Sequence, residues 1–132
     1  MIDVEVTGAE ALEQGPDVER IELLCRWAFA AACVEDGHVS VAIVGEADIH
    51  RLNLEHRGVD RPTDVLSFPV DGAGPTIGPR ELGDVVICPP CCESVDRAVV
   101  HGALHLVDMD HETDDGEMLA VEAEIMRWAD RQ

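Results

Sequence analysis

Hydrophobic and polar residues follow two periods along the chain, and each period predicts one kind of secondary structure. Strict alternation predicts strands. Apolar residues every three to four positions, such as Ile21, Leu24 and Ala28, predict helices that bury one face. Asp17 stands where a helix N-cap is expected, and Gly58 stands where a helix should end. The strands are expected at residues 2–6, 38–45, 64–70 and 83–89, and the helices at 17–36, 46–58, 94–107 and 114–131. This order predicts an α+β fold.

The predicted elements follow one another with no linker, repeat or low-complexity tract between them. Residues 71–82 form a loop rich in Gly and Pro with no element of its own. A chain of 132 residues is long enough to bury one hydrophobic core. We therefore expect residues 1–132 to form a single domain, in which one sheet of about four strands packs against helices.

The chain is strongly acidic, since 28 Asp and Glu residues against 9 basic residues give a formal net charge of −19. Such a charge repels the phosphates of nucleic acids. Residues 49–70 are different, because they carry equal numbers of arginines and carboxylates and so have no net charge. If a polyanion binds this protein, we expect it to bind near this stretch.

Other features of the composition bear on the compartment. No run approaches the roughly 20 apolar residues that span a membrane, so no membrane partner is expected. The first residues, MIDVEVTGAEALEQ, lack the basic and apolar regions of an export signal, and we expect a cytoplasmic protein. The five cysteines are typical of free thiols. The CPPC stretch at 88–91 resembles redox motifs, but the order of elements around it differs from that of thioredoxin. The oligomeric state stays open.

Three of the six histidines lie in the stretch HGALHLVDMDH, residues 101–111. On a helix, His101 and His105 are one turn apart and project from the same face, so their imidazoles can hold one ion. His111 becomes a third ligand if the chain reverses after the helix. Three protein ligands and one open position are typical of catalytic zinc. We predict one zinc ion per chain, held by His101, His105 and His111 at the end of a helix. The alternative is that these histidines only pack against the fold or lie in a loop.

The histidine spacing is also that of the metzincin peptidases, whose motif is H-E-x-x-H-x-x-G-x-x-H. The Glu of that motif is the general base that activates water. Gly102 stands at the corresponding position of this chain. A metallopeptidase therefore stays an alternative only if a carboxylate reaches the metal from elsewhere in the chain.

The same stretch resembles the H-G-x-L-H-L-x-G-x-D-H signature of the YbeY family of bacterial metal-dependent endoribonucleases. HRGVDRPTDVLSFP, at 56–69, is similar to the family's R-x-K-x-x-P-T-D-V-L-S-F-P stretch. LGDVVIC at 82–88 and GEMLAVEAEIM at 116–126 resemble two further blocks, so the resemblance covers roughly residues 46–128. One departure is Asp108, which replaces a Gly of the family.

The resemblance implies a zinc-dependent endoribonuclease, a hydrolase of phosphodiester bonds, that cleaves single-stranded RNA. It implies a role in ribosomal RNA processing, namely maturation of the 3′ end of 16S rRNA, and in ribosome quality control. The ribosome or a ribosomal protein is then the expected partner. A ribosome-assembly factor whose metal is only structural is the remaining alternative, and it would differ in having no open coordination position.

Two further residues are candidates for roles beside the metal. Arg57 matches an arginine that is functionally important in the family, and its guanidinium is suited to hold a scissile phosphate beside a metal. Alternatively, Arg57 neutralises Glu55 or Asp60. Asp110 is a candidate to orient a metal-bound histidine through a hydrogen bond, or else it only caps a turn.

Overall fold

Four strands and four α-helices make up the computed structural model, which describes residues 1–12, 16–107 and 116–131. The strands are β1 (Ile2–Thr7), β2 (Gly37–Ile43), β3 (Val65–Pro69) and β4 (Glu81–Ile87). The α-helices are α1 (Val18–Ala31), α2 (Glu46–Arg57), α3 (Val95–Leu106) and α4 (Glu117–Ala129), and the 3-10 helices are η1 (Ala9–Ala11) and η2 (Pro89–Cys91). The predicted α+β class is confirmed.

The strands form one mixed sheet in the order β1-β2-β4-β3. β1, β2 and β4 run parallel to one another, whereas β3 pairs antiparallel with β4. β4 is thus inserted between β2 and β3, and β3 lies at one edge of the sheet as far as the structure describes it. The inner strands β2 and β4 are rich in buried Val and Ile, as expected for strands covered on both faces.

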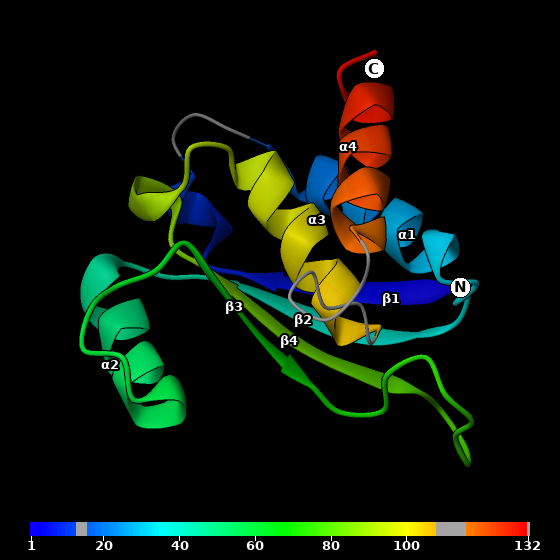
Figure 1. The fold of residues 1–132 in the computed structure, drawn as a ribbon, viewed down its shortest axis with the longest axis horizontal. Coiled ribbons are helices and arrows are strands. Elements are labelled where there is room, and N and C mark those ends of the chain that lie inside the picture. The colour runs from blue at the N-terminus through cyan, green and yellow to red at the C-terminus, as the bar shows by residue number, and fades with distance from the viewer. Residues whose placement is uncertain (13–15, 108–115, 132) are drawn as a thin grey trace.

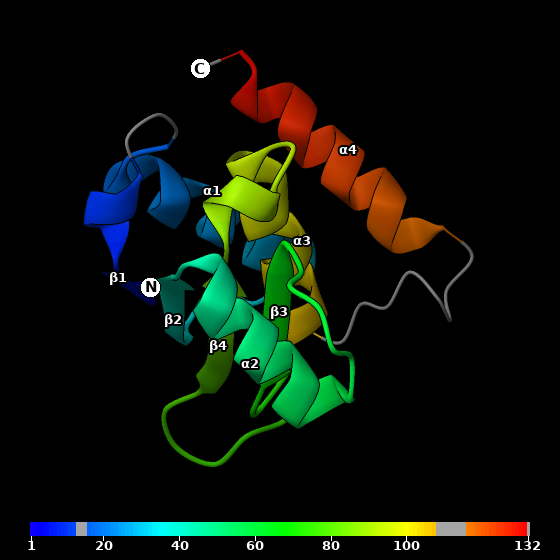
Figure 2. The same cartoon turned by 90° about the vertical axis from the view of Figure 1, so that its left-hand side faces the viewer.

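Helices cover both faces of the sheet (Figures 1 and 2). α1, α3 and α4 lie on one face, where Phe29, Leu104 and Ile125 belong to the larger hydrophobic core. α2 lies on the other face, where Ile49 packs in a smaller core with Leu66 of β3. β3 therefore separates α2 from α3, and residues of both helices reach its open edge.

The ends of the elements follow from local chemistry. The Asp17 side chain accepts a hydrogen bond from the Arg20 main-chain N–H at 2.9 Å, which confirms the predicted N-cap of α1. Gly58 ends α2 with φ 70°, in the left-handed region that favours glycine. β4 begins at Glu81, within the predicted loop, because the ladder to β3 continues past Pro69: Val70 donates to the Leu82 carbonyl at 3.1 Å.

Within the described residues, no helix has both the length and the apolar character needed to cross a membrane.

Candidate metal centre and substrate pocket

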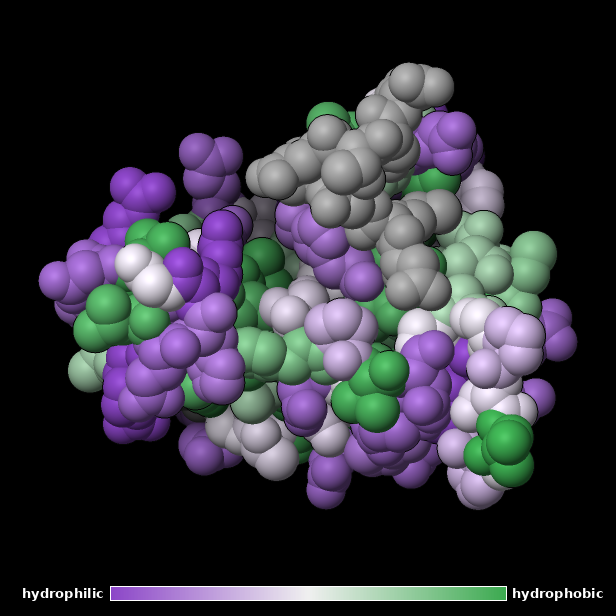
Figure 3. Space-filling view, turned by 60° about the horizontal axis from the view of Figure 1, so that its bottom comes forward, coloured by the Kyte–Doolittle hydropathy of each residue, from purple (hydrophilic) through white to green (hydrophobic). Residues whose placement is uncertain are grey.

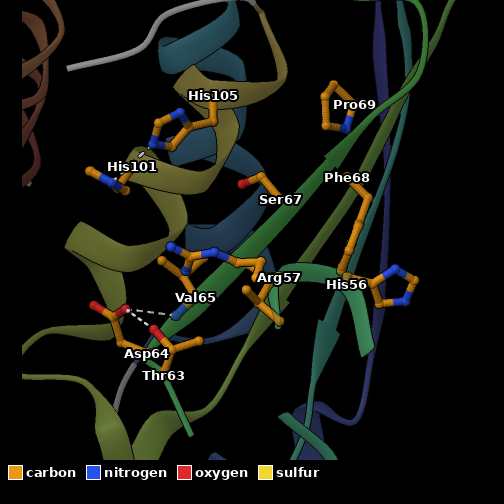
Figure 4. Close-up of a pocket in the computed structure, with 11 residues that line it drawn as sticks. His56, Arg57, Thr63, Asp64, Val65, Ser67, Phe68, Pro69, His101 and His105 are labelled. Carbon is orange, nitrogen blue, oxygen red and sulfur yellow. Dashed lines mark hydrogen bonds between the residues drawn. The ribbon is translucent and has the colours of Figure 1, made fainter. Parts of the chain in front are cut away.

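A pocket of about 570 Å³ runs along β3 (Figure 4). It is lined by His56 and Arg57 from the end of α2, by residues 63–69, and by His101 and His105 from α3. The two histidines of α3 are far in sequence from the other lining residues, so the pocket exists only because the sheet brings α2 and α3 to the same strand. The face of the molecule seen in Figure 3 is mostly hydrophilic, with apolar side chains scattered over it.

His101 and His105 meet at the α3 side of this pocket (Figure 4). Their Nε2 atoms are 3.2 Å apart, and their rings are edge-to-face with centroids 4.8 Å apart. Two nitrogens bound to one tetrahedral zinc at the usual Zn–N length are about 3.3 Å apart. The pair therefore has the spacing that two ligands of one zinc ion require.

Glu122 of α4 contacts the His101 ring on its Nδ1 side, away from His105. Its side chain is only 6 % exposed, and Oε1 accepts a hydrogen bond from His101 Nδ1 at 2.8 Å. Its other oxygen, Oε2, pairs with the Arg97 guanidinium at 3.1 Å. A carboxylate on Nδ1 holds the proton there, so that His101 presents the lone pair of Nε2 toward His105. This is the arrangement that metal-binding histidines usually have.

The pKa of Glu122 reflects the same contacts. Burial alone would raise it, but the hydrogen bond and charge of His101, followed by those of Arg97, outweigh burial and lower the pKa of this carboxyl. Glu122 is therefore ionised at neutral pH. The sequence interpretation missed this residue. The signal was present, because Glu122 lies on the buried face of a helix beside Met118 and Met126, where a carboxylate requires a partner.

The third predicted ligand, His111, lies outside the described residues, as do Asp108 and Asp110. Among the residues that the structure describes, no group of three His, Cys, Asp or Glu side chains is arranged to hold a metal ion. The structure thus brings together two of the three predicted histidines, and the complete zinc site stays a prediction. Glu122 supports His101, and the role predicted for Asp110 stays a prediction.

Arg57 lines the pocket opposite the histidine pair, from the last residue of α2 (Figure 4). Asp60, one of its two expected neutralising partners, instead bonds to His50 Nε2 at 2.7 Å. Within the described part of the chain, neither Glu55 nor any other carboxylate forms an ion pair with Arg57. Arg57 is exposed and lines the pocket, and none of the described carboxylates neutralises its guanidinium there.

His56 precedes Arg57 at the end of α2. It is exposed, but it also lines the pocket, and its ring contacts Phe68 edge-to-face with centroids 5.0 Å apart. His38 lies apart from the pocket on β2, where Nδ1 is 2.9 Å from a Glu81 carboxylate oxygen.

Gly102 explains why α3 can approach β3 so closely. A Cβ at this position would lie 2.6 Å from Val85 Cγ1 and 3.2 Å from Ser67 Oγ. The Gly102 carbonyl also accepts a hydrogen bond from the Ser67 hydroxyl at 2.9 Å. A Glu here, as in the metzincin motif, would have no space on the sheet side of the helix. The peptidase alternative would therefore need a carboxylate from another part of the chain.

All five cysteines are free thiols. Cys88 and Cys91 meet at the short helix η2, with their Sγ atoms 3.5 Å apart. Burial is the main reason why the pKa of Cys88 rises to about 11 and that of Cys92 to about 12, so both thiols are protonated at neutral pH.

Comparisons with known proteins agree with this architecture. Residues 13–129 match the model of a family described as Endoribonuclease YbeY. A protein of that name from Rubrobacter xylanophilus is 48 % identical over 97 residues, which cover 70 % of this chain and 69 % of the relative. Another from Acinetobacter baylyi is 42 % identical over 109 residues, or 69 % of each chain. The solution structure of TM1509 from Thermotoga maritima has a TM-score of 0.56 and 27 % identity, covering 96 % of this chain and 88 % of that one.

The relatives are named endoribonucleases, and the pocket is lined by three imidazoles and an arginine. Fold and site together define a hydrolase that acts on RNA. The chain belongs to the Endoribonuclease YbeY family.

Proposed function

We propose that this protein is a zinc-dependent endoribonuclease that cleaves single-stranded RNA. In this proposal it acts in the cytoplasm on precursors of ribosomal RNA, where it matures the 3′ end of 16S rRNA and takes part in ribosome quality control. The ribosome or a ribosomal protein would supply the cations that an acidic chain of net charge −19 lacks.

The observation that carries the proposal is the histidine pair with its buried support. The Nε2 atoms of His101 and His105 are 3.2 Å apart, and Glu122 and Arg97 hold the first of them in one tautomer. Together with His111 they would hold one zinc ion, which when bound would supply Lewis-acid activation at the scissile phosphate. The donor set is nitrogen-rich, as zinc prefers.

The other residues of the pocket would act on the substrate directly. Arg57 would bind two phosphate oxygens through its guanidinium fork and stabilise the negative charge that grows during cleavage. Gly102 keeps α3 close to β3, so that the histidines and Arg57 face one pocket. Glu122 would keep the Nδ1 proton on His101 throughout.

The test is a comparison of substrates with the zinc-loaded protein. We expect cutting of unpaired RNA, little action on duplex RNA and none on casein. A chelator should abolish the cutting and added zinc should restore it. Hydrolysis of peptides with RNA left intact would refute the proposal, and bound zinc without any cleavage would support a structural metal instead. A 2′-deoxy nucleotide at the cut site then identifies the nucleophile, because loss of cleavage indicates the 2′-hydroxyl and retention indicates water.

A further inference from the structure

The open edge of β3 carries main-chain groups whose direction follows from its pairing with β4. Cys88 donates to the Asp64 carbonyl at 2.9 Å, and Val70 donates to the Leu82 carbonyl at 3.1 Å. In an antiparallel ladder hydrogen-bonded pairs alternate with non-bonded pairs. The main chain therefore faces β4 at even-numbered positions from 64 to 70. At Val65, Ser67 and Pro69 it faces away from β4, along the open edge.

The outward donors of this edge are reduced to one among the residues of β3. The Val65 N–H is bound at 2.8 Å by Oδ1 of Asp64, which precedes it. Pro69 has no N–H. Ser67 thus provides the outward N–H, while the carbonyls of Val65, Ser67 and Pro69 all point the same way. Another strand would find only one N–H donor along β3 and would pair with it poorly. The edge of β3 therefore offers mainly hydrogen-bond acceptors.

This edge forms the floor of the pocket. Residues from both faces of β3 line it, Val65 and Ser67 on the α3 side and Leu66 and Phe68 on the α2 side, so the pocket follows the edge itself (Figure 4). In an extended chain the C=O of one residue and the N–H of the next but one point to the same side. The Val65 carbonyl and the Ser67 N–H are such a pair.

The main-chain groups along the edge of β3 determine which kind of ligand group can bind there. Three carbonyl oxygens beside the Asp64 carboxylate would repel a phosphate, but they suit a group that brings its own donors. The Val65 carbonyl accepts a hydrogen bond and the Ser67 N–H donates one. Together they complement a base that carries an amine next to an unprotonated ring nitrogen. Adenine (N6 and N1) and cytosine (N4 and N3) carry that pair on their Watson–Crick edges, whereas uracil and guanine carry the reverse at the corresponding atoms.

We propose that the edge of β3 binds an unpaired adenine or cytosine of the RNA. The exocyclic amine donates to the Val65 carbonyl, and the Ser67 N–H donates to the ring nitrogen. His56 and Phe68 lie beside this edge and offer a ring against which the base stacks. In a duplex the Watson–Crick edge is occupied by the opposite base, so this subsite gives a physical reason for a preference for single strands. The inference rests on the proposed ribonuclease function.

The first experiment changes only the base. Short oligouridylates carry one central adenosine, cytidine or inosine, and both cleavage by the zinc-loaded protein and binding by fluorescence anisotropy are measured. Inosine has nearly the shape of adenosine but exchanges donor and acceptor at both contacts. We expect adenosine and cytidine to be favoured over inosine about tenfold, because two hydrogen bonds are lost. Equal binding and equal cleavage of all oligonucleotides would overturn the inference.

A pair of variants then tests the main-chain donor. Ser67→Pro removes the N–H at an edge position whose N–H faces outward, where proline is tolerated. Ser67→Ala is the matched control, because it keeps the N–H and loses only the hydroxyl bond to Gly102. The ratio of adenosine to inosine should fall to about one in the proline variant and stay near that of the unmodified protein in the alanine variant. An unchanged ratio in Ser67→Pro would refute the assignment.

Failure of the ribonuclease function and failure of the subsite give different results. If the ribonuclease function is wrong, no oligonucleotide is cut. The binding affinities of the oligonucleotides, measured by fluorescence anisotropy, then test the subsite. If only the subsite is wrong, every oligonucleotide is cut at the same rate. Should Ser67→Pro not fold, the comparison of bases on the unmodified protein still confirms or overturns the inference.

Discussion

Replacement of Glu122 by glutamine should weaken zinc binding while leaving the fold intact. Glutamine has the shape of glutamate but carries one acceptor and one donor group where the carboxylate has two acceptors. The His101 Nδ1–H and the Arg97 guanidinium both donate to this side chain, at 2.8 and 3.1 Å. In Glu122→Gln the new amide NH₂ must face one of these two donors.

The cost of this conflict follows from the burial of the site. Glu122 has a side chain only 6 % exposed, so water does not replace the lost contact. Loss of one hydrogen bond to a charged group should lower the free energy of unfolding of the metal-free protein by about 1.5–3 kcal/mol. Loss of the carboxylate behind a metal-binding histidine should weaken zinc affinity by about 10–100-fold.

Glu124→Gln is the matched control. It is the same substitution on the same helix, but its side chain is 47 % exposed and pairs with Arg127 at the surface. Competition with a chromophoric chelator measures the zinc Kd of both variants, and urea denaturation with chelator present measures their stability. Equal zinc affinity and equal stability in the two variants would refute the role given to Glu122.

Three further predictions concern other parts of the protein. Gly102→Ala should lower the free energy of unfolding by about 1–3 kcal/mol, because the added methyl group overpacks against the sheet, although alanine is the better helix former. A variant that is more stable in urea than the parent would contradict this. Arg57→Ala should abolish RNA cleavage with zinc content unchanged, while Arg51→Ala, on the same helix but away from the pocket, should keep activity; normal cleavage by Arg57→Ala would make Arg57 a surface residue. The hydrogen bond to Glu81 raises the pKa of His38 above its ordinary value of 6.5. Protonated His38 therefore stabilises the fold fully below pH 6.5, and this stabilisation is lost as pH rises through the raised pKa. His38→Gln should therefore lower Tm at pH 5.5 more than at pH 8.5, and an equal loss at both pH values would exclude this ion pair.

Several features could be predicted from the sequence because short-range physics decides them. Asp17 caps α1 and Gly58 ends α2, since an N-cap carboxylate and a left-handed glycine depend on only a few neighbouring residues. The positions of β1 and β2 follow from alternation. The spacing of His101 and His105 places them on one face of any helix, and the structure brings their Nε2 atoms together.

Tertiary structure alone decided what surrounds these histidines. Glu122 lies 21 residues beyond His101, and only the packing of α4 on α3 brings its carboxylate to that ring. The order β1-β2-β4-β3 is likewise non-local, because β4 enters the sheet beside β2 and leaves β3 at the edge. That choice turns the Ser67 N–H outward and places Arg57, from the opposite face of the sheet, in the same pocket as the histidines. Local periodicity contains no information on which strands become neighbours, since burial of both faces of the sheet is satisfied only by the chain as a whole.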